Sequence, residues 1–194
     1  MLALTLVAGA CSSHSSSSSS SSSGGGGAGA TTGTTASTTS TTAATTRSCP
    51  AGSLAGSVTG QTGAAGTIEM TIRLRNTSSS ACVLGGYPGM QLLDANGAQL
   101  PTTVVRGGSY PFANLTPTTV TLAPGAVAYF NLGYSDVPSG GETACPKASS
   151  MWVTPPNAVD HLTLVTTLAP CSGGTVVVSP VFGPGSPATQ TTAP

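Results

Sequence analysis

The sequence predicts an all-β domain, an immunoglobulin-like antiparallel β-sandwich of about seven or eight strands with two disulfides, preceded by a disordered linker. Short runs of alternating apolar and polar residues recur between residues 49 and 183. Turn signals separate these runs every 8–15 residues or so, and no amphipathic helix of normal length is present. Four cysteines lie in the same region. A Greek-key barrel is the alternative architecture.

The clearest predicted strand covers residues 67–76. Ile68, Met70, Ile72 and Leu74 alternate with polar residues, which places one face towards a core and Glu69 on the outward face.

Turn signals place the remaining strands. The segment 90–94 leads into Asn96-Gly97, a strong hairpin signal, and a further strand is expected through Leu100. Ala123-Pro124-Gly125 separates a strand that ends at Leu122 from alternation over 126–134. The last strands are expected at 151–153, 161–166 and 175–179.

The N-terminal segment carries the pattern of an export signal. Residues 1–10, MLALTLVAGA, are apolar and end in small residues, but they are too few for a bilayer span of about 20 residues. Because Cys11 follows directly, we expect a lipoprotein signal peptide, with Cys11 as the lipidated first residue of the mature protein. Two features depart from this pattern: Ala8 at the third position before the cysteine, and no Lys or Arg before the apolar run. The alternative is a fortuitous apolar start with a free cysteine.

Residues 11–48 are predicted to form a disordered Ser/Gly/Thr-rich tether. From Ser12 to Ser48 there is no Leu, Ile, Val, Phe, Tyr or Trp to bury. Such a chain has an r.m.s. reach of roughly 30–35 Å, which suits the lifting of a domain off a membrane. Residues 184–194 are expected to form a disordered tail.

Charge is scarce and balanced. Charged residues make up 5% of the chain, and five basic residues offset five acidic ones. This composition gives no electrostatic footprint for nucleic acid and fits a secreted or envelope-exposed protein. We therefore expect an extracytoplasmic protein anchored to the outer face of the cell membrane.

The cysteines other than Cys11 predict two disulfides, because an even number in an exported chain is typical of a disulfide framework. We favour Cys49–Cys82 and Cys145–Cys171, since each pair closes a loop of about 30 residues. The crossed pairings are the alternatives. A four-cysteine metal site is not expected, because no C-x-x-C pair is present.

Two stretches, NTSSSACVLGGYPGMQLLDANG at 76–97 and TLAPGAVAYFNLGYSDV at 121–137, carry a family resemblance. The chain resembles the actinobacterial domain-of-unknown-function family 4232 over residues 49–183. Its members look like secreted proteins or lipoproteins with a low-complexity linker before one β-sandwich domain. The resemblance implies the fold, the disulfides and the envelope location, but no reaction, cofactor or catalytic residue.

Catalytic and cofactor-binding sites are not predicted. There is no G-x-S-x-G motif, and the adjacent Asp160 and His161 would point to opposite faces of a strand. Glu69 and Asp94 belong to an outward strand face and a turn, which leaves few carboxylates from which to build the pair that glycoside hydrolysis needs. Asp136 and Glu142 could hold a weak calcium ion, although a solvated loop is favoured. No glycine-rich phosphate loop is present.

Tyr87 and Trp152 are the candidate ligand contacts, because exposed aromatic side chains often mark carbohydrate or protein contacts. For Trp152 a place in the core between two sheets is favoured. The sequons at Asn76 and Asn114 are taken as accidental in a Thr-rich chain.

Three functional hypotheses follow. The first is a non-enzymatic, lipid-anchored binding or structural module, with a cell-wall glycan or an envelope protein as its partner. The second is an accessory or sensor subunit of an envelope protein complex. The third, a cryptic wall hydrolase, would need a cleft that gathers His161 with two carboxylates.

Overall fold

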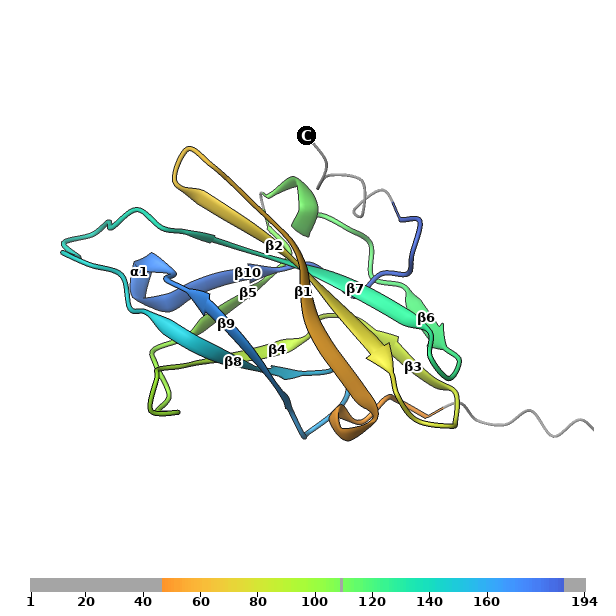
Figure 1. Ribbon diagram of the computed structural model, residues 1–194. Helices are drawn as coiled ribbons and strands as arrows, with labels where there is room; N and C mark the ends of the chain where they lie inside the picture. Colours follow the sequence, from red (N-terminus) through yellow and green to blue (C-terminus); the bar gives the residue numbers. More distant parts are fainter. Residues whose placement is uncertain (1–46, 109, 187–194) are drawn as a thin grey trace, which may run out of the picture. The chain divides into compact units, whose positions relative to one another are not determined.

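The computed structural model describes residues 47–108 and 110–186. The predicted signal peptide, the lipidated Cys11, nearly all of the tether and the end of the tail lie outside these residues. Within them the fold is mostly β, with ten strands in three sheets (Figure 1). No described helix is long and apolar enough to cross a membrane.

The strands differ widely in length. They are β1 (Leu54–Ala64), β2 (Thr67–Asn76), β3 (Cys82–Gly85), β4 (Gly89–Leu93), β5 (Thr103–Arg106), β6 (Thr119–Leu122), β7 (Val127–Ser135), β8 (Ala148–Thr154), β9 (Leu162–Leu168) and β10 (Thr175–Val178). Three short helical turns accompany them: η1 (Ala51–Ser53), η2 (Pro111–Ala113) and α1 (Cys171–Gly174).

The largest sheet has the order β1-β2-β7-β10-β5. The predicted strand 67–76, now β2, pairs antiparallel from Thr67 to Arg75 with β7, the central strand of this sheet. At its edge β5 pairs with β10 in parallel. The expectation of a purely antiparallel sandwich is therefore wrong at this pair, and ten strands replace the seven or eight expected.

The other two sheets are smaller. β4, β8 and β9 form an antiparallel three-stranded sheet, and β3 pairs with β6. One apolar cluster joins all three sheets. Its fully buried members include Met70, Ile72 and Phe130 from the large sheet and Met151 and Val153 from the three-stranded sheet. The alternating apolar face of the sequence thus forms the core.

Two segments depart from the predicted strands. Residues 98–100 form no strand, because only an isolated bridge joins Gln99 to Leu93. Conversely, β1 lacks an apolar alternation and owes its strand conformation to the hairpin with β2, whose turn contains Ala65 and Gly66 at positive φ.

Both expected disulfides are present. Cys49 is joined to Cys82 and Cys145 to Cys171, with Cα–Cα distances of 5.0 Å and 4.5 Å. The predicted local pairing is therefore confirmed. Two disulfides indicate an extracytoplasmic protein, because such bonds persist in oxidising compartments.

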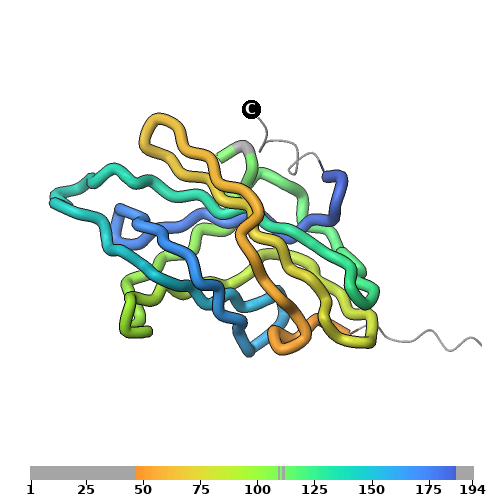
Figure 2. The backbone as a smooth tube through the Cα atoms, viewed as in Figure 1, coloured from red at the N-terminus to blue at the C-terminus, as the bar shows by residue number. Residues whose placement is uncertain are grey.

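The two bridges lie at opposite ends of the domain. The described chain begins beside β3, where the Val83 N–H donates to the Arg47 carbonyl (Figure 2). The second bridge anchors the long β7–β8 connection to α1 at the other end.

Candidate functional site

The adjacent Asp160 and His161 serve separate structural roles. The exposed Asp160 carboxylate accepts hydrogen bonds from the backbone N–H groups of Ala51 and Gly52, and the Ala51 bond is the main reason that its pKa lies below the ordinary value. Asp160 thereby fixes η1 to the loop that precedes β9. His161 stacks on Trp152 instead, with ring centroids 4.1 Å apart.

The Glu142 carboxylate likewise accepts hydrogen bonds from backbone N–H groups. Its two carboxylate oxygens accept N–H groups from Ser172 and Gly173, each at 2.7 Å, and these bonds lower its pKa. Among the described residues, no group of three or more His, Cys, Asp and Glu side chains is placed to hold a metal ion. The carboxylate considered for calcium thus organises the turn that follows Cys171.

Glu69 faces away from the main core, as expected, but it is not fully exposed. Register places it beside Gly133, whose missing side chain leaves room for the Phe112 ring. One carboxylate oxygen of Glu69 is buried without a hydrogen-bond partner, and burial raises the pKa of this group. Asp94 lies in the predicted turn, where its side chain accepts the N–H groups of Asn96 and Ala98.

Trp152 is not a core residue. Met151 and Val153 are fully buried, so the side chain between them points to the outer face of β8, where it is half-buried. The favoured core placement is therefore wrong. On this outer face Trp152 lies opposite Gln91 of β4 and Thr163 of β9.

The two sequons have different environments. Asn76 is fully buried, and its amide donates to the carbonyls of Ser80 and Leu122, so it cannot accept a glycan in the folded domain. Asn114 is exposed directly after η2.

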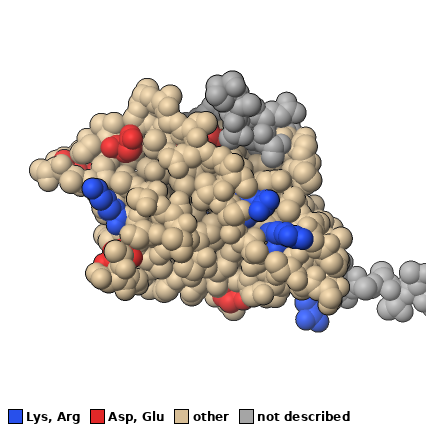
Figure 3. Space-filling model, viewed as in Figure 1, with Lys and Arg blue, Asp and Glu red and all other residues tan. Residues whose placement is uncertain are grey.

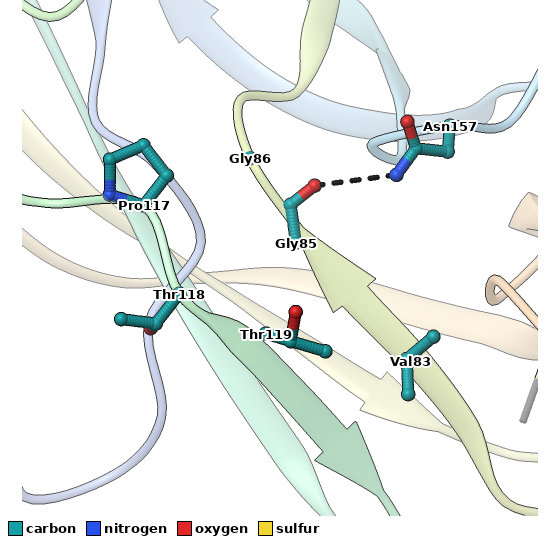
Figure 4. A pocket seen from close by; sticks show the side chains of 7 residues that line it. All are labelled: Val83, Gly85, Gly86, Pro117, Thr118, Thr119 and Asn157. Atoms are coloured by element: carbon teal, nitrogen blue, oxygen red, sulfur yellow. Dashed lines mark hydrogen bonds between the residues drawn. The ribbon is translucent and has the colours of Figure 1, made fainter.

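A concave region of the described domain surrounds Asn157 in the β8–β9 loop. Three adjoining hollows share this residue, and we call them together the Asn157 groove. The largest, of about 360 Å³, lies over Gly85 and Gly86 and is walled by Val83, Pro117, Thr118 and Thr119 (Figure 4). The Asn157 amide donates to the Gly85 carbonyl across this hollow at 3.4 Å.

The other two hollows extend the groove in different directions. One, of about 290 Å³, is lined by Tyr87, Arg106, Pro156 and the two glycines. The other, of about 210 Å³, is lined by Ser48, Cys49, Pro50 and the loop from Asn157 to Asp160. The candidate contact Tyr87 therefore lies in the groove, whereas Trp152 lines none of its three hollows.

The groove has one free charge. The Asp160 carboxylate in one hollow is already bound by backbone, whereas the Arg106 side chain in another makes no ion pair or hydrogen bond among the described residues. The face of the molecule in Figure 3 is largely uncharged, with a few isolated basic and acidic side chains spread over it. The groove can therefore offer one cation, neutral amide and hydroxyl groups, and backbone.

A family model described as a domain of unknown function, DUF4232, matches residues 49–182. The chain belongs to the DUF4232 family. The match covers most of the chain and runs from the first cysteine of the domain to the end of the core at Phe182. A search of curated proteins found no match to this DUF4232 protein.

Most lining residues of the groove in this DUF4232 domain could not be found from sequence. Asn157 lies in the β8–β9 loop, Pro117 in the connection before β6 and Arg106 at the end of β5, and no sequence spacing links the three positions. The one usable signal is the Gly85-Gly86-Tyr87 stretch, where two glycines precede an aromatic residue and leave a backbone floor beside a ring.

Proposed function

We propose that this protein is a lipid-anchored, extracytoplasmic binding module without enzymatic activity, and that its ligand occupies the Asn157 groove. The observation that carries the proposal is the convergence of three hollows on one asparagine amide, with hydroxyl groups and glycine backbone around it. Small-molecule sites typically combine a concave surface with a few convergent polar groups. The engagement of Glu142 and Asp160 by backbone supports a binding role over a hydrolytic one.

A second proposal concerns the topology of the domain. We propose that the domain is a variant of the immunoglobulin-like sandwich in which the edge strand β5 joins β10 in parallel. The support is one buried cluster that joins a five-stranded sheet to a three-stranded sheet.

Photo-crosslinking in intact cells tests the binding proposal. A photoreactive amino acid at Thr118, an exposed wall of the largest hollow, should yield covalent adducts that mass spectrometry can identify. The same amino acid at Ala95, an exposed turn residue outside the groove, is the control. Equal adducts at both positions would show that the groove is not a binding site.

A substitution at Asn157 provides a second test of the binding proposal. It has a φ of 62°, a left-handed conformation that glycine adopts without strain. Asn157→Gly should therefore keep the loop while it removes the amide, and it should strongly reduce the Thr118 adducts. Unchanged adducts would exclude the amide from binding.

The anchoring part of the proposal rests on Cys11. Replacement of Cys11 by alanine should release the protein into the medium or leave the precursor uncleaved. More than one acyl chain is needed for lasting attachment, because a single chain binds membranes only marginally. Partitioning of Cys11→Ala into the detergent phase at the wild-type level would refute the anchor.

A second candidate function, a subunit of an envelope protein complex, is supported by exposed apolar side chains. Val165 is 89% exposed, and it lies on the same outer face as Trp152, two residue pairs away along β8 and β9. Val159 in the β8–β9 loop is fully exposed. Val165→Thr should release a protein partner in a pull-down from cross-linked cells if this face is an interface, and leave the Thr118 adducts unchanged.

A further inference from the structure

The hollow at Arg106 has the chemistry of an anion-binding site. Arg106 ends the edge strand β5, its side chain is exposed, and none of the other lining residues is acidic. An arginine guanidinium binds a carboxylate through two parallel hydrogen bonds, which fixes both its position and its orientation. The charge of this hollow thus complements a carboxylate ligand.

The floor of the hollow adds backbone groups from β3. Val83 uses its N–H and carbonyl to pair with Arg47 and Cys49 on the edge of β3 opposite β6. By the two-residue repeat of a strand, the N–H and carbonyl of Gly85 face the same edge, two residues beyond this pairing. The Gly85 carbonyl accepts the Asn157 amide there. The absence of side chains at Gly85 and Gly86 lets another backbone approach closely.

We propose that the Arg106 hollow binds the free C-terminal carboxylate of a short peptide. Arg106 holds the carboxylate, the Gly85 N–H and the Asn157 side chain bind the last peptide groups, and the Tyr87 ring covers the terminal side chain. The preceding residue extends into the larger hollow beside Pro117 and Thr118. This assignment rests on the proposed function, since it names the ligand class of the Asn157 groove.

A peptide fits these observations better than an acidic sugar. The hollow of about 290 Å³ has room for a small terminal residue, and the polar groups beside Arg106 are an amide and strand-edge backbone. Amide and strand-edge groups pair with peptide groups in the manner of an added strand. The only hydroxyl among the residues that line this hollow belongs to Tyr87.

The test compares an acid with its amide. The full chain, purified in detergent, is titrated with N-acetyl-Ala-Ala and with the same dipeptide carrying a C-terminal amide, and binding is measured by calorimetry. The acid should bind about ten- to a hundredfold more tightly, the range expected for hydrogen bonds to a charged group. Arg106→Gln should remove this preference, and salt should weaken the acid selectively.

Arg73→Gln is the matched control. Arg73 is an exposed strand arginine that lines none of the three hollows of the groove, so this variant should keep the preference for the acid. Equal binding of acid and amide, no binding of the acid at millimolar concentration, or the same loss in both arginine variants would each overturn the proposal. Selective binding of glucuronate in place of the dipeptide would overturn the peptide assignment.

These outcomes separate the two proposals. If acid and amide bind equally and Asn157→Gly weakens both, the carboxylate assignment fails while the groove remains the binding site. If crosslinks at Thr118 do not exceed those at Ala95, the groove itself fails as a site.

Discussion

Removal of the Cys49–Cys82 bridge should cost the domain a large share of its stability. The bridge links the start of the described chain to β3, and both residues lie in the core, with Cys49 fully buried and Cys82 4% exposed. The perturbation is the double substitution Cys49→Ala/Cys82→Ala, which leaves no free thiol at this position.

The magnitude follows from the loop that the bridge closes. For a sequence separation of 33 residues, the chain-entropy model gives about 3.7 kcal/mol of stabilisation through the unfolded state. Loss of two buried sulfur atoms from the core adds about 1–2 kcal/mol. The sum of about 5 kcal/mol compares with a total of about 5–15 kcal/mol for a typical domain.

The second bridge provides an internal comparison. Cys145 and Cys171 are 26 residues apart, which gives about 3.5 kcal/mol. Cys145 is half-exposed and Cys171 buried, so the packing loss is smaller than for the first bridge. The double variant at 145 and 171 should therefore be destabilised less than the double variant at 49 and 82.

Guanidinium unfolding monitored by circular dichroism measures both losses, with the wild type and both double variants in the same buffer. A loss below about 1 kcal/mol for Cys49→Ala/Cys82→Ala would refute the reasoning. So would a reversed order of the two variants, because loop length and burial both favour the first bridge.

Two further variants test local features. Burial raises the pKa of Glu69 above its ordinary value of 4.5, so stability is lost as pH rises from about 4.5 through the folded pKa. Glu69→Gln should therefore gain melting temperature over the wild type at pH 7, and the gain should shrink by pH 4; a gain independent of pH would contradict this cause. Gly174 has a φ of 76°, and an added Cβ would lie 2.9 Å from the Pro101 carbonyl carbon and closer still to its oxygen. Gly174→Ala should cost about 2–4 kcal/mol in thermal unfolding, against about 1 kcal/mol for Gly173→Ala, which has positive φ but open space around it. Equal losses would show that the contact with Pro101 is relieved by movement.

The local alternation of residues and the turn signals predicted many of the strands. The alternation over 67–76 predicted β2 and its buried face, and the turn at Ala123-Pro124-Gly125 separated β6 from β7. The parallel pairing of β5 with β10 was not predictable, since it joins segments about 70 residues apart and local alternation carries no such information.

The outward placement of Trp152 could have been predicted from the sequence. In a strand with Met151 and Val153 on the inner face, the residue between them must point outward. The period of two already indicated this placement, and the preference for a buried tryptophan came from residue type alone. The stacking of His161 on its ring could not be predicted, because it depends on how the β8–β9 loop returns.

The Asn157 groove could not be predicted from the sequence, for a different reason. Its walls come from strands and connections whose relative positions are set only when the sheets pack, and its floor is formed by Gly85 and Gly86, which have no side chains. Residue patterns predict faces and turns, whereas a hollow depends on the distances between segments.

The structural roles of the few acidic side chains in this domain determine which groups remain available for ligand binding. Of its five acidic side chains, Asp94, Glu142 and Asp160 hold backbone N–H groups of turns, and Glu69 lies partly buried beside Gly133. The first three carboxylates organise loops, and neither Glu69 nor Asp136 lines the groove, so ligand binding there falls to amides, hydroxyl groups, backbone and the unpaired Arg106 side chain. Salt should therefore weaken only the part of the binding that depends on Arg106, while the contribution of Asn157 should persist at high ionic strength. Binding that survives salt in Arg106→Gln but is lost in Asn157→Gly would assign the neutral part of recognition to the asparagine amide.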